Sequence, residues 1–418
     1  MREQCKGNPK KRSWTKYKRR KFLTKAICGF FLVLFLVTGM GNLKVSAQSS
    51  EISDSESQTE EQTDTSVTEG LLDNLDMQSI DDYLSENDET KDISFMDLIQ
   101  NLMSGESGNY LEQAGTYVGN LLFQELNENR KFLVVIIALA VAFALLKNFS
   151  AIFQNSYISE LCFILVYIEM MILLMKSFLV VNQLLSSTLD KTVEFMKVLL
   201  PVFCMSMVFS NGTASAAGFY EMAFFIIFIV QWIMLYLLAP LIQVFVVMQF
   251  LNYILEGEKF TRMCELLEGG ILWGMKIIMT VVLGMNVVQS LINPAVDRLK
   301  TTSVSKTLSM IPGIGNSVSA IGQMLIGTGM VIKNSVGVAA MLIIVLLGLI
   351  PLLKMGVMTF LYKLAAASVE PITDKRISGS INGVFRGSLL AAKLMLTSLF
   401  LFLITIAMIT AASSYVAG

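Results

Sequence analysis

The stretch MIPGIGNSVSAIGQMLIGTGMVIKNSVG, residues 310–337, is followed by VAAMLIIVLLGLIPLLKMGVMTFLYKLAAASVEP, residues 338–371. The first part is rich in glycine, and the second is an apolar run that contains Pro351. About 20 apolar residues are enough to cross a bilayer, and proline and glycine are tolerated where neighbouring helices satisfy the backbone. The stretch therefore predicts a membrane helix that is broken at Pro351 and preceded by a flexible glycine segment.

The composition sets the class of protein. The chain has 418 residues, of which 54% are hydrophobic and 16% charged, and its mean hydropathy is +0.62. These values predict an all-α polytopic membrane protein. The chain has no histidine, which excludes Ser-His and Cys-His catalysis and HExxH zinc sites. Its five cysteines form no CxxC pair, so we predict no catalytic, cofactor-binding or metal-binding residues.

The first 47 residues have the form of a secretory signal peptide. Residues 1–25 contain eleven Lys and Arg, residues 26–37 are apolar, and Val45-Ser46-Ala47 offers a cleavage site. The alternative is an uncleaved signal anchor. In both cases the residues from 48 onward are expected to face outward.

Two further segments precede the membrane domain. Residues 48–112 contain eighteen Asp and Glu against Lys91 alone. We therefore predict that residues 48–92 form a disordered acidic tether, because they cannot bury enough apolar surface to fold. In residues 93–130 the apolar positions recover helical spacing, which predicts an amphipathic juxtamembrane helix that lies on the outer membrane face or packs on a partner helix.

Residues 131–418 are predicted to form the polytopic transmembrane domain. About six spans are expected, within limits of five to eight, and a polar stretch at 182–197 separates the second from the third. The third is too long for one straight span and contains Pro240, so it is either a broken helix or a span with a re-entrant half. The expected spans cover residues 132–149, 158–181, 219–255, 270–291, 310–371 (the broken segment) and 387–411.

The spacing of prolines indicates a weak internal repeat. Pro201 and Pro240 are 39 residues apart, and so are Pro312 and Pro351. Apolar segments match one another easily by chance, so the pattern is either a repeat or a coincidence. If it is a repeat, broken helices at matching positions point to a site between the two copies.

Glu169 is the first candidate for a functional residue. A carboxylate within a membrane span costs a few kcal/mol unless it is paired or hydrated. Lys176 lies about two turns along the same expected helix. The pair predicts either a polar lining with an ion or proton site, or an inter-helix pair that fixes assembly. The remaining candidate polar or hinge positions, for which packing or snorkelling is the alternative, are Pro240, Gly313, Gly315, Lys333, Asn334, Pro351 and Lys363.

Five groups of residues carry a resemblance to a known family. They are Ile311-Pro312, Lys333-Asn334-Ser335-Val336-Gly337, Pro351, Tyr362-Lys363-Leu364-Ala365-Ala366-Ala367 and Pro371. This set resembles the corresponding part of the stage III sporulation protein AE family of endospore-forming Firmicutes. The resemblance covers about residues 93–418 and is strongest over 309–371.

The resemblance implies a role in endospore formation. It implies a non-enzymatic component of a channel or secretion-like complex that links mother cell and forespore and sustains late forespore gene expression. The implied partners are other stage III sporulation membrane proteins, including an ATPase and a forespore-side channel protein, besides membrane lipid. The implied location is the mother-cell-derived outer forespore membrane, with the N-terminal region in the intermembrane space.

The residues themselves leave a second class of function open. A stand-alone secondary transporter with a site at the middle of the membrane near Glu169 has the same composition and broken helices. The chain contains no G-x-x-x-x-G-K-[ST] motif, so a transport process that needs ATP requires an ATPase partner. We predict no cofactor and no nucleic-acid partner.

Overall fold

The structure of the chain is a computed structural model. It describes residues 75–87, 90–91, 93–104, 127, 131, 134–138, 141–142, 144–145, 156–211, 213–254, 259–308 and 315–412. All of these residues belong to one compact unit that spans residues 61–418. No strand occurs among them, so the expected all-α class is confirmed.

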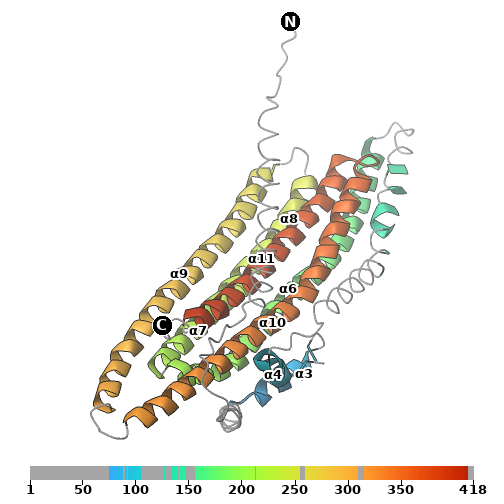
Figure 1. Cartoon of the computed structure of the whole chain (residues 1–418). Coiled ribbons are helices and arrows are strands. Elements are labelled where there is room, and N and C mark those ends of the chain that lie inside the picture. Colours follow the sequence, from blue (N-terminus) through green and yellow to red (C-terminus); the bar gives the residue numbers. More distant parts are fainter. Residues whose placement is uncertain are drawn as a thin grey trace. The chain divides into compact units, whose positions relative to one another are not determined.

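Long helices make up most of the unit (Figure 1). Five helical segments are long and apolar enough to cross a membrane, which confirms the polytopic class. They cover Ile164–Val208, Tyr220–Ile254, Thr261–Val288, Gly327–Val369 and Lys375–Ala411. The helices that contain them are α6 (Ser156–Asn211), α7 (Thr213–Ile233), the π-helical turn η1 (Met234–Leu238), α8 (Ala239–Ile254), α9 (Thr261–Leu308), α10 (Gly315–Val369) and α11 (Lys375–Ala412).

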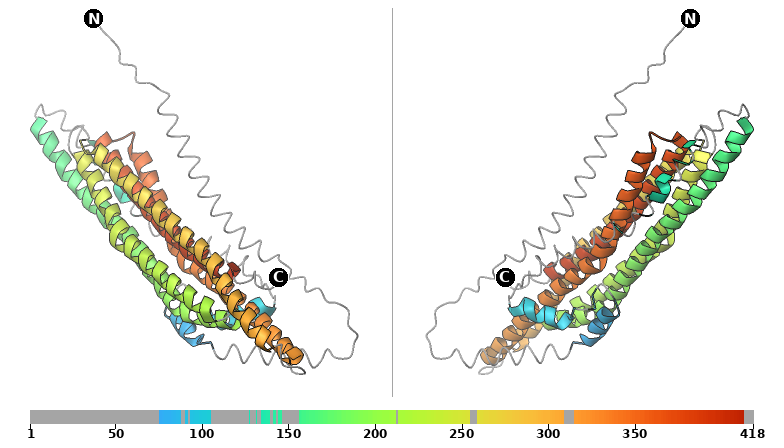
Figure 2. Two further views of the ribbon diagram at one scale, coloured as in Figure 1. Left: turned by 90° about the vertical axis from the view of Figure 1, so that its left-hand side faces the viewer. Right: turned by 90° about the vertical axis from the view of Figure 1, so that its right-hand side faces the viewer.

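α11 is the helix around which the others pack. It contacts α6, α8, α9 and α10, and its contact with α10 is the most extensive in the unit. α10 packs against α6 on another side, and α7 lies between α6 and α9. The long helices run alongside one another in both views of Figure 2.

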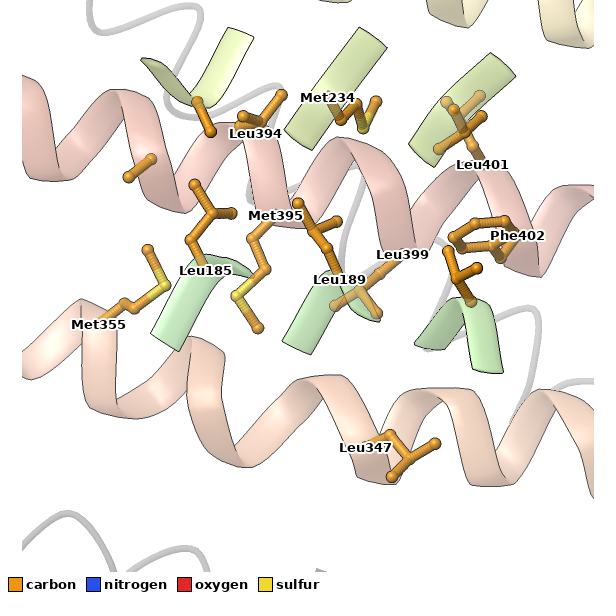
Figure 3. Packing of buried hydrophobic residues seen from close by; sticks show 14 of the residues in the cluster. Leu185, Leu189, Met234, Leu347, Met355, Leu394, Met395, Leu399, Leu401 and Phe402 are labelled. Carbon is orange, nitrogen blue, oxygen red and sulfur yellow. The ribbon is translucent and has the colours of Figure 1, made fainter. Parts of the chain in front are cut away.

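The core between these helices is apolar. Leu185 and Leu189 of α6, Met355 of α10 and Met395 of α11 are all buried and point into the space between the helices (Figure 3). Methionine is unbranched and polarizable, so it fills irregular gaps between helices well.

Pro240 widens its helix locally but does not break it, so the predicted broken helix is wrong. The five residues before Ala239 form the π-helical turn η1, and the Ala239 N–H donates to the carbonyl oxygen of Met234. Proline has no N–H and its ring crowds the preceding turn, so a wider turn removes the clash. In place of the predicted break there is a single π-helical turn within one continuous helical path from α7 to α8, and no re-entrant half is formed.

Pro351 does not break its helix, and this prediction is wrong. α10 continues through it from Gly315 to Val369 with Pro351 buried. A proline inside a membrane helix removes one backbone hydrogen bond, and packing by neighbouring helices offsets that loss. α10 packs along α6 and α11, which supplies that support.

The polar stretch at 182–197 is also helical, so the predicted boundary of the second span at 181 is wrong. α6 runs without interruption through this stretch and through Pro201. Within it Asp190, Glu194 and Lys197 are exposed while Thr192 and Phe195 are buried. The stretch is amphipathic, and one helix face packs in the core while the other is polar.

Two short helices pack against the long ones. α3 (Gln78–Glu86) contacts α6, and α4 (Phe95–Ser104) contacts α10. α3 is blue and α4 is cyan in Figure 2. The Tyr83 hydroxyl donates to the Lys191 carbonyl oxygen at 2.6 Å. Phe95 and Ile99 of α4 are fully buried, so this helix, at the start of the expected amphipathic segment, packs its apolar face on the bundle.

The prediction of a disordered tether is wrong for residues 78–86, because Ile80 and Leu84 of α3 bury their side chains on the bundle. The rest of the expected tether before residue 75, residues 105–126 of the amphipathic segment and most of the expected span at 132–149 lie outside the described residues.

A line of glycines lets α11 approach α8. Gly379, Gly383 and Gly387 lie four residues apart and face Tyr253, Gln249 and Val246 in turn. A Cβ added at Gly383 would lie 2.8 Å from the Gln249 Cβ atom, closer than real Cβ contacts allow. Small residues at this spacing are the usual way in which membrane helices pack closely.

We expect Gly383→Ala to lower the free energy of unfolding by about 1–3 kcal/mol, because the new methyl group overpacks the contact with the Gln249 Cβ atom, which is fixed to its backbone. Gly356→Ala on α10 is the matched control, since a Cβ there meets nothing within 4 Å. The control should keep or raise stability, by up to about 1 kcal/mol, because alanine favours helix over glycine. Thermal unfolding of both variants in detergent measures the difference; equal midpoints would contradict the close contact.

Candidate functional site

Lys333 is the most deeply buried charged residue that the structure describes. Its side chain is 0% exposed, and its Nζ donates to the Thr410 carbonyl oxygen at 3.3 Å. α11 ends at Ala412, so this carbonyl is one of the last four, which have no donor within the helix. The ammonium therefore caps the C-terminal end of α11, where the helix dipole favours positive charge.

Gly337 explains how Lys333 reaches that end. It lies one turn further along α10, and a Cβ there would collide with the Thr410 side chain and lie 3.3 Å from the Phe203 ring. The residue must be glycine for α10, α11 and α6 to meet at this point. The Lys333–Gly337 segment that carries the family resemblance is thus a three-helix contact.

The other candidates on α10 differ in their surroundings. Asn334 is half-buried, and its buried Oδ1 has no partner among the described residues. Lys363 is exposed, and its Nζ lies 5.0 Å from the centre of the Phe385 ring on α11, a cation–π contact. Gly315 begins α10, whereas Gly313 lies outside the described residues.

Two buried tyrosines link α6 to neighbouring helices toward the end of the bundle at which α11 begins. The Tyr167 hydroxyl of α6 donates to the Phe250 carbonyl oxygen at 2.8 Å and lies 2.7 Å from the Ser380 hydroxyl. The Tyr362 hydroxyl of α10 lies 2.6 Å from that of Ser177. A buried hydroxyl is costly without a partner, so these contacts fix which helix faces meet.

α9 is fixed to α11 by two polar contacts. Glu268 forms an ion pair with Arg386, and both side chains are about three-quarters buried, with 21% and 25% exposed. Asn286 donates from Nδ2 to the Thr405 hydroxyl at 3.1 Å. These contacts hold the two helices together. Neither of them pairs a nucleophile with a general base.

Glu169 and Lys176 lie outside this interior. Both are exposed on the outer face of α6, among the exposed apolar residues Leu165 and Ile172. Tyr167, two residues before Glu169, contacts α11 only five residues after that helix begins. Glu169 therefore lies near one end of the bundle and faces away from its interior, a position that does not favour an enclosed ion site at the membrane middle.

The structure also brings together residues that sequence reasoning did not select. They are Tyr167, Glu268, Asn286, Arg386 and the glycines Gly379, Gly383 and Gly387. The four-residue spacing of the glycines was a readable signal for helix packing. The polar pairs had no such signal, because each joins segments about a hundred or more residues apart.

The fold and the polar contacts define a multi-helix membrane protein whose described polar groups join helices to one another. Comparison with known proteins then identifies its family. The model of stage III sporulation protein AE matches residues 93–413, so the chain belongs to this family. The stage III sporulation protein AE of Bacillus subtilis (strain 168) is 25% identical over 292 residues, which cover 69% of this chain and 73% of that protein. No solved structure matches the chain significantly.

We expect Lys333→Met to loosen the end of α11 while the bundle keeps its stability. The change removes a charged donor from the Thr410 carbonyl but also removes the cost of burying a charge. A hydrogen bond to a charged group contributes about 1.5–3 kcal/mol, so amide exchange in residues 409–412 should rise about tenfold or more. Hydrogen exchange measures this, with Lys354→Met as the control on the same helix; unchanged exchange would contradict the cap.

We expect Arg386→Met and Glu268→Gln each to destabilise the bundle by about 1–3 kcal/mol, because each leaves a partly buried charge without its partner. The double variant should lose less than the sum of the two. A double-mutant cycle on thermal unfolding measures the coupling. Additive losses would show that the two charges do not interact.

Proposed function

We propose that this protein is a non-enzymatic membrane component of the complex that links mother cell and forespore during endospore formation. The observation that carries the proposal is its membership of the stage III sporulation protein AE family over most of its length. In this role the protein supports forespore development and late forespore gene expression.

The fold is compatible with a part that assembles and positions other parts. Its described polar side chains, such as Lys333, Tyr362 and Arg386, bond from one helix to the next. Among the described residues no group of three or more His, Cys, Asp or Glu could hold a metal ion. These features support a structural role in the membrane.

The proposed partners are the other stage III sporulation membrane proteins of the same complex, including an ATPase and a forespore-side channel protein. The proposed location is the outer forespore membrane. We place the N-terminal region in the intermembrane space. Within the described part of that region, α3 packs against α6 and α4 packs against α10.

Deletion of the gene in its host tests this function. We expect small, collapsing forespores and a silent late forespore reporter after engulfment, and both defects should disappear when the wild-type gene is restored. Microscopy and the reporter signal measure the result. Normal spores in the deletion strain would overturn the proposal.

Purification from sporulating cells tests the assembly. The full-length protein, extracted with mild detergent, should bring down other stage III proteins, and it should not do so from a strain that lacks them. A protein that restores sporulation but purifies alone under conditions that keep the other stage III proteins associated would argue against a place in the complex.

A further inference from the structure

Two outer helix faces carry opposite charges in a defined order. On α6 the exposed Glu169 is followed by the exposed Lys176, and neither forms an ion pair with another described residue. On α9 the exposed Arg262 is followed by the exposed Glu265, again without an ion pair to any residue that the structure describes. The order of charges is negative then positive on α6, and positive then negative on α9.

Contacts with α11 show how far along the bundle axis each residue of α9 lies; we call this position its height. Glu268 pairs with Arg386, and further along both helices Asn286 contacts Thr405. The two helices therefore run in the same direction, with almost the same number of residues between the two contacts.

The heights of α6 residues are set by the same helix. Tyr167 contacts Ser380, and Phe178 lies next to Gly387, so α6 also runs in the direction of α11. Gly387 follows Arg386 directly in the chain. Phe178 of α6 and Glu268 of α9 consequently lie at nearly the same height in the bundle.

The heights of Lys176 on α6 and Glu265 on α9 can be compared from this common level. Lys176 lies two residues before Phe178, and Glu265 three residues before Glu268. Lys176 is then level with residue 385 of α11 and Glu265 with residue 383, so at about 1.5 Å per residue the two heights differ by about 3 Å.

The second pair of charges is placed by the nearer contact of α6 with α11. Glu169 lies two residues after Tyr167, which contacts Ser380, so it is level with about residue 382 of α11. Arg262 lies six residues before Glu268, the partner of Arg386, so it is level with about residue 380, and the two heights differ by about 3 Å. Lys259 lies one turn further away, and both basic residues are exposed and have long side chains.

The two faces cannot meet within one chain. α7 and α8 pack between α6 and α9, and Figure 1 shows α9 at one edge of the bundle. In a second copy inserted in the same orientation, however, the α6 face of one copy and the α9 face of the next stand at the same height. A two-fold contact of α6 with α6 would instead place Glu169 against Glu169, and like charges in contact repel.

The α9 face also suits a close contact. Gly269 and Gly270 are exposed, and a Cβ at either would meet nothing within 4 Å. The large apolar side chains of Leu266 and Trp273 flank them and are 70% and 68% exposed. Small residues bordered by apolar ones let a neighbouring helix approach closely in a membrane.

We propose that copies of this chain associate side by side in the membrane, in one orientation, through two different faces (a head-to-tail contact). The outer face of α6 packs on the outer face of α9 of the next copy, Lys176 pairs with Glu265, and Glu169 pairs with Arg262 or Lys259. A head-to-tail contact between copies of one orientation forms a ring if the rotation closes. The inference concerns the chain's own assembly and does not depend on the proposed function.

Cross-linking of the full-length protein in membranes tests the register. In a background without the five natural cysteines, Lys176→Cys with Glu265→Cys should give dimers and a ladder of higher species with a short bis-maleimide. A flexible linker is needed because the Cα atoms of a Lys–Glu pair are further apart than a disulfide allows. Lys176→Cys with Lys276→Cys is the matched control, because Lys276 lies eleven residues beyond Glu265, about 16 Å away along α9, and should give none.

Charge exchange provides the second test. Lys176→Glu alone and Glu265→Lys alone should each lower the oligomer fraction about tenfold or more, and the double exchange should restore it, because like charges are removed from the contact. Glu370→Arg, an exposed change in the turn after α10, should have no effect. Each variant must give a monodisperse size-exclusion peak, which separates loss of contact from misfolding.

Three results would overturn the proposal. The first is a well-folded Lys176→Cys, Glu265→Cys variant that gives no cross-linked species. The second is efficient dimer formation by Lys176→Cys alone, which would indicate a two-fold contact. The third is a double charge exchange no better than the single ones.

Discussion

The close approach of α11 to α8 and α10 is the constraint on which the rest of the bundle depends. Lipid tails are as apolar as leucine, so helices in a membrane gain little from hiding apolar side chains and are held by close packing and hydrogen bonds. Gly383 faces Gln249 on one side of α11, and Gly348 of α10 faces Leu399 on the other. With the backbones this close, hydroxyls such as those of Ser380 and Thr405 reach partners on other helices.

Much of the fold could be predicted from sequence, because runs of apolar residues longer than a bilayer have few alternatives to helix. The errors arose where conformation depends on neighbours. Pro240 is accommodated by a π-helical turn, whereas Pro351 sits in a continuous helix supported by α6 and α11. Both prolines stand in similar apolar sequence, so local pattern alone could not distinguish them. The expected repeat would correspond to the α6–α8 and α9–α10 hairpins and stays a prediction.

The candidate site was harder to predict for a related reason. Helical spacing shows which residues share a face, but a helix that is apolar all round gives no sign of which face is inward. From sequence, snorkelling to the membrane surface is the alternative role expected for Lys333, yet its ammonium is fully buried against the end of α11. The sequence predicts that Glu169 lines a polar site or pairs between helices, yet in the structure it faces outward. Only the packing of α6 and α10 on α11 determines these directions.

The polar stretch at 182–197 shows how composition can be right about environment and wrong about conformation. α6 has 56 residues and is about 84 Å long, whereas a hydrocarbon core of about 30 Å, crossed at the usual upper tilt of about 40°, takes up only about 26 residues. At least half of α6 must therefore lie outside the hydrocarbon. The stretch at 182–197 is the part best suited to do so, because it exposes the charged Asp190 and Glu194, which are costly in hydrocarbon. α3 packs at this stretch, where the Tyr83 hydroxyl donates to the Lys191 carbonyl oxygen. The polar residues are thus compatible with a continuous helix that extends beyond the hydrocarbon, and α3, which precedes the matched family region, packs against the same part of α6.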